Sequence, residues 1–200
     1  MRHDALGNRE RILAAAEEVF GEHGAAGSTR EVASRAGVGI GTVFRHFPTK
    51  NELIEAALIR HFTRLTDRAH ALADAGQPDK ALRALVREMI ETGPAKITLA
   101  SLSAGHGKLP PGALDASREL RGAVEAVLRR AQDAGQVRRD ATIDEVYLLV
   151  RSLAQASAAM PVPPGTLRRA TEIILAGLAS PGADARQAQP AAAHATRPTG

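Results

Sequence analysis

The chain has 200 residues, enough for one or two domains with a buried core. Its 26 Lys and Arg residues outnumber 22 Asp and Glu residues, for a formal net charge of +4, and the absence of cysteine excludes disulfides, iron–sulfur clusters and cysteine nucleophiles. With 4 Phe, 1 Tyr and no Trp, the chain lacks the aromatic residues for a platform that stacks single-stranded nucleic acid.

Apolar residues recur at helical spacing through most of the sequence, without the alternating runs that are typical of strands. The pattern predicts an all-α fold of about nine helices. In chain order we expect them over about residues 9–23, 28–36, 40–46, 49–74, 79–92, 95–103, 113–134, 142–159 and 166–179. No apolar run approaches the ~18 residues of a membrane span, and the first residues lack a secretory signal, so we expect a cytoplasmic protein without a membrane partner.

Helix starts and stops are marked by short polar motifs. Three Ser/Thr-x-x-Glu pairs have the spacing of a capping box, in which each side chain satisfies a free amide at the helix start. These pairs are Ser28 with Glu31, Thr49 with Glu52, and Thr142 with Glu145. Gly24, Gly37 and Gly135 follow expected helices, where a left-handed residue ends a helix.

Positive charge gathers around the second and third expected helices. Four cations and one anion give residues 28–50 a net charge of +3, whereas residues 10–27 carry −3. The charged residues of the basic segment are Arg30, Glu31, Arg35, Arg45 and Lys50. Two short helices joined by a glycine-containing turn, with cations on the second helix and its flanks, are typical of a helix-turn-helix that enters the major groove of DNA. For Arg35 alone we expect a salt bridge or solvent exposure rather than a base contact.

An ordered set of residues from about position 9 to 58 resembles the N-terminal domain of the TetR/AcrR family of bacterial transcriptional regulators. The residues that carry the resemblance are Ile12-Leu13-Ala14-Ala15-Ala16, Phe20, Gly24, Thr29-Arg30-Glu31-Val32-Ala33, Ala36-Gly37-Val38, Gly41-Thr42-Val43-Phe44-Arg45-His46-Phe47, Lys50 and Leu53. The resemblance implies a regulator that binds a palindromic double-stranded DNA operator as a homodimer. It further implies a repressor that an unidentified small-molecule effector releases.

The resemblance also implies which residues contact DNA. They are Ser28, Thr29, Arg30, Gly39, Ile40, Gly41, Thr42, Phe44, Arg45, His46 and Lys50. Thr29 and the start of its helix would hold a phosphate, and Arg30 would reach a guanine edge or a phosphate. The start of the recognition helix, residues 39–42, would lie near bases. Arg45 and His46 would contact the DNA backbone, with a base also within the reach of Arg45, and Lys50 would hold a phosphate.

Two residues depart from the family pattern. Phe44 stands where the family usually has a tyrosine whose hydroxyl meets a phosphate. Gly39 stands where a serine often caps the recognition helix, and glycine is a weaker cap. We therefore expect sparse direct reading of bases, with more weight on backbone contacts and DNA shape.

The rest of the chain matches the family's ligand-binding and dimerisation domain in helix number. The segment Ala134-Gly135-x-Val137-Arg138-x-Asp140 is similar to a turn in the SbtR-like subgroup. We expect a DNA-binding domain over 1–52, a helical ligand-binding and dimerisation domain over 53–180, and a disordered tail over 181–200, which is rich in Pro, Ala and Gln.

Ligand and dimer residues are weaker hypotheses. The ligand candidates are Met89, His106, Tyr147 and Arg151. Small and apolar residues on the last two helices permit close helix approach, and in similar proteins these helices form a four-helix dimer interface. The dimer candidates are Leu148, Ala154, Leu167, Ala170, Ile174 and Leu178. Core packing, a surface pair and a solvated loop histidine are the alternatives for these residues.

Other kinds of site fit the sequence poorly. The glycines at 37, 39 and 41 lack the preceding strand and the third glycine of a dinucleotide fingerprint, because residue 44 is Phe. The seven histidines form no i,i+4 pair, so we expect no metal site. The sequence offers no nucleophile–base constellation, so we expect no catalytic residue and no cofactor. The alternatives to a ligand-relieved repressor are a constitutive or architectural DNA-binding protein and a small helical enzyme.

Overall fold

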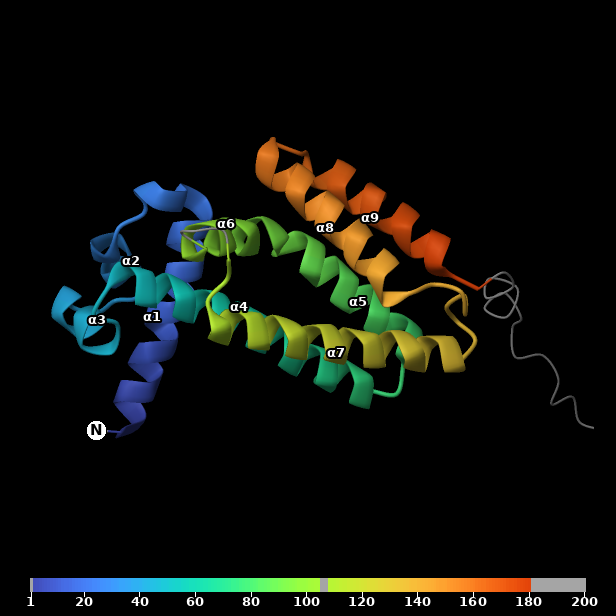
Figure 1. Cartoon of the computed structure of the whole chain (residues 1–200), viewed down its shortest axis with the longest axis horizontal. Helices are drawn as coiled ribbons and strands as arrows, with labels where there is room; N and C mark the ends of the chain where they lie inside the picture. Colours follow the sequence, from blue (N-terminus) through green and yellow to red (C-terminus); the bar gives the residue numbers. More distant parts are fainter. Residues whose placement is uncertain (1, 105–107, 181–200) are drawn as a thin grey trace, which may run out of the picture.

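The computed structural model describes residues 2–104 and 108–180, which form nine α-helices and one short 3-10 helix (Figure 1). In chain order they are α1 (Arg2–His23), η1 (Gly24–Ala26), α2 (Thr29–Arg35), α3 (Ile40–His46), α4 (Lys50–Asp74), α5 (Pro78–Glu91), α6 (Gly93–Ser103), α7 (Pro111–Asp133), α8 (Ile143–Ala159) and α9 (Pro164–Leu178). The predicted all-α class is confirmed. Within the described residues, β-pairing is limited to one isolated bridge between Val137 and Ala179.

Most helix boundaries lie within two residues of the prediction, with α1 as the exception. That helix begins at Arg2, not near residue 9, because its first turns lack the apolar periodicity on which the prediction rested. Four prolines, Pro78, Pro94, Pro111 and Pro164, lie in the first turns of α5, α6, α7 and α9. Proline is tolerated there because the first amides of a helix have no intrahelical partner.

The predicted cap residues lie at the helix starts. Ser28 Oγ and Thr49 Oγ1 each accept a hydrogen bond of 3.1 Å from the amide of the glutamate three residues on. Thr142 and Glu145 complete a reciprocal capping box at the start of α8. Gly24, Gly37 and Gly135 all have φ between 55° and 69°, the left-handed conformation predicted for helix stops.

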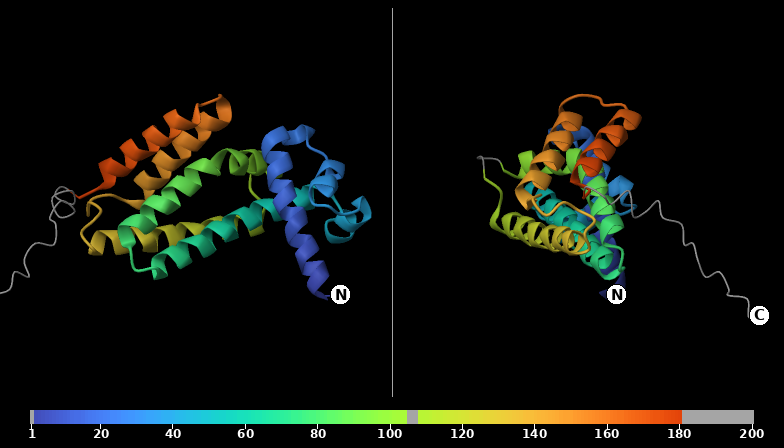
Figure 2. Two further views of the ribbon diagram at one scale, coloured as in Figure 1. Left: turned by 180° about the vertical axis from the view of Figure 1, so that it is seen from behind. Right: turned by 90° about the vertical axis from the view of Figure 1, so that its right-hand side faces the viewer.

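The molecule has a small head and a larger helical body (Figures 1 and 2). Helices α1, α2 and α3 form the head together with the start of α4, around the buried side chains of Phe20, Val32 and Val43. Helix α4 continues into the body, where α7 runs beside it along most of its length. Helices α8 and α9 form a pair on the outer side of the body.

Helix α6 packs closely against both the head and the body, on α1 at one contact and on α8 at another. A Cβ added at Gly21 of α1 would lie 2.9 Å from Cβ of Ala95, so only glycine lets α1 approach α6 this closely. At the start of α6, a Cβ added at Gly93 would lie 2.4 Å from Cβ of Ala154 on α8. Both glycines serve interhelical packing.

The predicted domain boundary between residues 52 and 53 falls inside α4, a helix that the head and the body share. That boundary stays a prediction, and the predicted tail over 181–200 lies outside the described residues. None of the helices described here is long and apolar enough to cross a membrane.

Candidate nucleic-acid interface and ligand cavity

Helices α2 and α3 are joined by a tight turn at Gly37, whose φ is 64°. The amide of Gly37 donates to the carbonyl of Ser34, and the amide of Val38 donates to the carbonyl of Ala33, closing the end of α2. The inner faces of both helices are buried, by Val32 and Ala33 on α2 and Val43 on α3. The outer face of α3 is left to solvent, as a helix that enters the major groove requires.

That outer face carries predicted DNA-contacting residues with little polar character. Ile40 is 40% exposed and Phe44 is 46% exposed, one turn apart on α3. Gly39 and Gly41 are also exposed, and no side chain caps the helix at Gly39. The weak cap expected at Gly39 is therefore confirmed. Apolar side chains at this position are suited to thymine methyl groups.

The four cations of the basic segment differ in whether the fold already pairs them. Arg30 and Arg45 are exposed on α2 and α3. Arg35 instead faces α1, where its guanidinium lies 2.9 Å from Glu22 and 3.7 Å from Glu18. The salt bridge expected for Arg35 is thus confirmed, and the net charge of the segment overstates the positive charge that faces outward.

Lys50 lies at the start of α4, as predicted, but its ammonium group turns inward. Nζ donates to the carbonyl oxygens of Ala25 at 2.8 Å and Gly27 at 2.6 Å, and lies 5.3 Å from the centre of the Phe20 ring. These contacts join α4 to the chain around η1. A phosphate contact by Lys50 stays a prediction, and only the third ammonium hydrogen is left for it.

The remaining predicted DNA-contacting residues lie at the same end of the molecule. Ser28 is exposed, but its hydroxyl oxygen already accepts from the amide of Glu31. Thr29 begins α2, and Thr42 and His46 lie on α3, all three half-buried. The head therefore brings the predicted residues to the ends and outer faces of two short helices, with Lys50 beside them at the start of α4.

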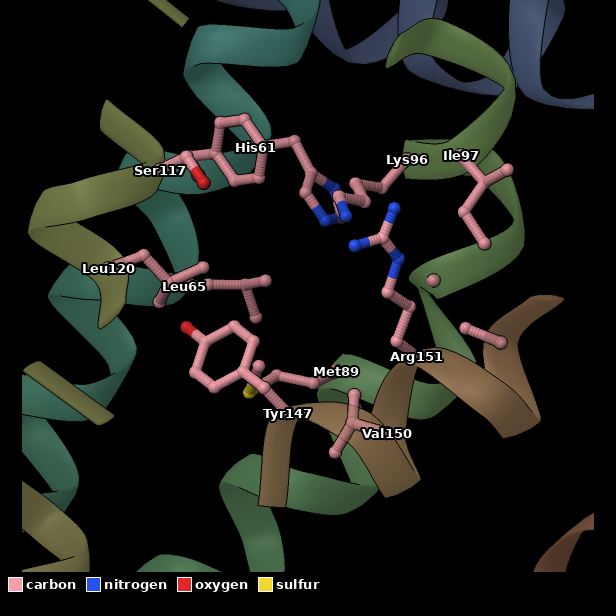
Figure 3. Close-up of a pocket in the computed structure, with 13 residues that line it drawn as sticks. His61, Leu65, Met89, Lys96, Ile97, Ser117, Leu120, Tyr147, Val150 and Arg151 are labelled. Carbon is pink, nitrogen blue, oxygen red and sulfur yellow. The ribbon is translucent and has the colours of Figure 1, made fainter. Parts of the chain in front are cut away.

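A cavity in the body brings together three of the four predicted ligand residues, Met89, Tyr147 and Arg151 (Figure 3). Its volume is about 160 Å³. The fourth candidate, His106, lies outside the described residues. The other lining residues come from α4, α6, α7 and α8: His61, Phe62, Leu65, Gly93, Lys96, Ile97, Ser117, Leu120, Val150 and Ala154.

Sequence analysis missed three polar residues of this cavity, His61, Lys96 and Ser117. The first two had a signal in the sequence. His61 holds a position at i,i+4 spacing between the buried Ala57 and Leu65, where an apolar residue is expected. Lys96 stands between Ala95 and Ile97 in a helix that contains no other charged residue.

His61 connects the cavity to the head. Its side chain is buried, and Nδ1 lies 3.6 Å from a carboxylate oxygen of Glu17 on α1. Burial disfavours the ionised form of Glu17, but hydrogen bonds from His61 and Arg60 and their charges outweigh burial and lower its pKa below 4.5. A buried polar contact thus joins α1 to α4 beside the cavity.

The predicted dimer residues separate into two groups. Leu148 is 65% exposed, and Leu167, Ala170 and Ile174 are half-buried on the outer helix pair. Ala154 and Leu178 are buried within the chain, so neither is available to a second subunit, and we remove both from the predicted interface. Ala154 is buried because Gly93 of α6 packs directly on it.

Other exposed apolar side chains of this outer helix pair were not among the predicted dimer residues. Ile173 is 73% exposed, and Leu149 on α8 and Met160, directly after α8, are also exposed. In the part of the chain that the structure describes, no group of three His, Asp or Glu residues has the arrangement of a metal site.

Two family models match separate parts of the chain. Bacterial regulatory proteins of the tetR family match residues 12–57, and the C-terminal domain of SbtR-like transcriptional regulators matches residues 77–180. The first match covers the head and the second covers α5 to α9, which includes most of the cavity wall.

Solved structures are similar over nearly their whole length. The TetR transcriptional regulator SCO0520 from Streptomyces coelicolor is 33% identical, with a TM-score of 0.77 over 86% of this chain and 99% of that chain. A TetR transcription regulatory protein from Mycobacterium vanbaalenii is also 33% identical, with a TM-score of 0.73 over 89% and 98%.

A curated relative is similar over a shorter stretch. The HTH-type transcriptional repressor Rv3405c from Mycobacterium tuberculosis is 42% identical over 88 residues, which is 42% of this chain. The match spans 47% of that relative, about half of its length.

Proposed function

The chain belongs to the TetR family of bacterial regulatory proteins, and from this premise we propose that it is a repressor that binds a palindromic DNA operator as a homodimer. Family members are transcriptional regulators and not enzymes. The exposed outer face of α3, held by a buried inner face, carries the proposal. Arg30, Phe44 and Arg45 are exposed on helices whose inner faces are packed, so the backbone that carries them needs little ordering when DNA binds.

We infer a homodimer because one head alone contacts too few base pairs to specify an operator. A single short recognition helix contacts few base pairs, whereas two heads in successive major grooves, ~34–36 Å apart, read two half-sites. The exposed apolar side chains of α8 and α9, with Leu148 and Ile173 the most exposed, support dimerisation through this face. Two copies of the helix pair would form a four-helix interface.

Release by a small molecule is supported by the cavity at the junction of α4, α5, α6, α7 and α8. A ligand that binds one arrangement of the two heads more tightly shifts the dimer toward that arrangement. If this arrangement misaligns the heads with the operator, the ligand relieves repression. A constitutive DNA-binding protein would have no need of such a cavity.

Selection from random duplexes followed by footprinting tests operator binding. We expect enrichment of a sequence with two inverted half-sites. Recovery of no sequence, or of one unpaired half-site, would contradict the homodimeric operator.

Sedimentation tests the dimer interface. Leu148→Glu and Ile173→Glu place charge on the exposed apolar face and should shift the protein toward monomer and weaken operator binding. Leu114→Glu on α7 is the matched control, because Leu114 is also exposed, at 39%, but lies off this face. A wild-type protein that is monomeric at micromolar concentration would refute the interface.

A further inference from the structure

One side of the cavity carries cationic side chains, and the carboxylate of Glu17 that lies beside it is already paired with Arg60 and His61. In Figure 3 the nitrogen-bearing ends of His61, Lys96 and Arg151 converge on the same region. The residues that line the cavity include no Asp or Glu. Burial lowers the pKa of Lys96, and the nearby charge of Arg151 lowers it further. Two cations therefore face one space in which nothing from the described chain neutralises them.

Lys96 lies in a half-buried position, where a charged ammonium group without a partner destabilises the protein. The ammonium group is half-buried and lies 5.8 Å from the centre of the Phe62 ring, which offers only a weak substitute for water or an anion. Arg151 is more exposed and lies at the edge of the cavity. A guanidinium and an ammonium on one wall are suited to a carboxylate, which accepts hydrogen bonds through both oxygens.

The other side of the cavity offers an unused hydrogen-bonding group. The hydroxyl of Tyr147 is buried and has no hydrogen-bond partner in the described structure. Figure 3 shows its oxygen pointing toward Leu120 and Leu65, away from the three nitrogen-bearing side chains. A buried hydroxyl without a partner loses the hydrogen bonds it makes in water, and a ligand group can restore one.

Apolar side chains separate these two polar ends. Leu65, Met89 and Leu120 form this part of the wall. A cavity of about 150 Å³ holds a molecule as large as benzene, so the 160 Å³ here suits a small ring or a short branched chain. A long acyl chain would need more room.

We propose that this cavity binds a small carboxylate with an apolar body and a hydrogen-bonding group at its far end. Lys96 and Arg151 hold the carboxylate, and Tyr147 bonds the opposite group. The proposal deepens the proposed function and rests on it for one consequence, that such a carboxylate releases the protein from DNA. Binding of the carboxylate itself does not depend on an operator.

A panel of carboxylates whose apolar body is about the size of a benzene ring, each paired with its own carboxamide, tests the ligand class. Binding is followed by the melting temperature and by tyrosine fluorescence, which reports on the cavity because Tyr147 is the chain's one tyrosine and there is no tryptophan. We expect at least one carboxylate to raise the melting temperature by about 2 °C or more while its carboxamide does not. Inorganic phosphate serves as the control anion.

Charge variants of Lys96 assign the carboxylate to the cationic wall. Lys96→Met should weaken binding of the active carboxylate about tenfold or more, and Lys96→Arg should restore most of it. Equal binding of acids and amides, binding of no carboxylate in the panel, or unchanged binding by Lys96→Met would overturn the proposal.

A second test needs no ligand. Because the unneutralised ammonium is costly in the empty cavity, Lys96→Met should raise the melting temperature of the free protein by about 2 °C or more. Lys80→Met on α5 is the matched control, since Lys80 is exposed. A fall in melting temperature for Lys96→Met would mean that Lys96 stabilises the fold and would refute a site for a ligand.

Operator binding by the wild-type protein separates the two proposals. If the protein binds its operator but no carboxylate, the ligand class is wrong and the repressor function stands. If a carboxylate binds and depends on Lys96, but no operator is found, the repressor function is wrong and the ligand site stands.

Discussion

The head and the body each contain a half-buried lysine, and the two have opposite surroundings. Lys50, in the head, donates to two backbone carbonyls that lie 23 and 25 residues away in the sequence. Lys96, in the body, has an arginine as its charged neighbour and faces a cavity without an acid. The ammonium group of Lys50 already has partners within the fold, whereas that of Lys96 is free to bind a ligand.

The arginines of the head also divide into one that the fold pairs and one that it leaves exposed. Arg35 is held by glutamates of α1, but Arg45 is exposed at the end of the recognition helix. Net charge along the sequence cannot distinguish these cases, because it counts paired and unpaired cations alike. The DNA contacts and the ligand site that we propose both rest on the unpaired cations.

The largest expected effect comes from removing an unpaired cation of the head. If Arg45 reads a base, Arg45→Ala should cost about 1–3 kcal/mol in each half-site and relax preference at one position there. The melting temperature should stay the same, because Arg45 is exposed. Binding to operator and scrambled duplexes at two salt concentrations measures both effects.

Arg129→Ala on α7 is the matched control for Arg45, since Arg129 is exposed and pairs with Glu125 on its own helix. If Arg45 contacts only phosphate, its loss should weaken all duplexes alike and reduce the salt slope by about one. Unchanged affinity for every duplex would contradict a DNA-binding role for this face.

Lys50→Met should instead act on stability. The change removes two hydrogen bonds from a charged donor, with an expected cost of about 1.5–3 kcal/mol and a fall in melting temperature of about 5 °C. Lys80→Met should leave the melting temperature unchanged. An unaltered melting temperature for Lys50→Met, together with a flatter salt slope, would favour the phosphate contact as the main role of Lys50.

Glu17 joins the two regions, and its titration tests that connection. Its pKa is lowered in the folded protein, so the ionised carboxylate stabilises the fold above the unfolded value of 4.5. That stability is lost as the pH falls through the folded pKa. Glu17→Gln should therefore lower stability at neutral pH and flatten its decline below pH 4.5.

Urea unfolding at several pH values measures the effect of Glu17→Gln. The exposed Glu119 on α7 provides a control, Glu119→Gln, for which we expect no change in the pH profile. An acid profile identical to that of the wild type would show that the contact with His61 does not couple α1 to α4.

The smallest effect is spectroscopic. Burial raises the pKa of Tyr147 to about 12, and the charge of Arg121 offsets this only in part. Absorbance of the tyrosinate should therefore develop well above pH 10 in the folded protein and near pH 10 in urea, where burial is lost. A titration midpoint near pH 10 in the folded protein would mean that water reaches the Tyr147 hydroxyl. The hydroxyl would then have no unmet hydrogen bond for a ligand to supply.

Local rules predicted the helices and the head well. Apolar periodicity and the Ser28, Thr49 and Thr142 caps act within one or two turns, so their consequences are visible in a short stretch of sequence. The ordered motif from 9 to 58 predicted the helix-turn-helix for the same reason. Tyr147 and Arg151, both predicted as ligand residues, lie four residues apart on α8 and line the same cavity.

By itself, then, the sequence determined the all-α class, the capped helix starts and the short helix pair that presents α3. The tertiary structure decided which charges are free, which alanine is buried and which lysine faces a cavity. Gly93 packs against the buried Ala154, and Lys50 is engaged because α4 begins beside Ala25 and Gly27. These contacts join residues far apart in the chain, and their geometry is set by how whole helices pack.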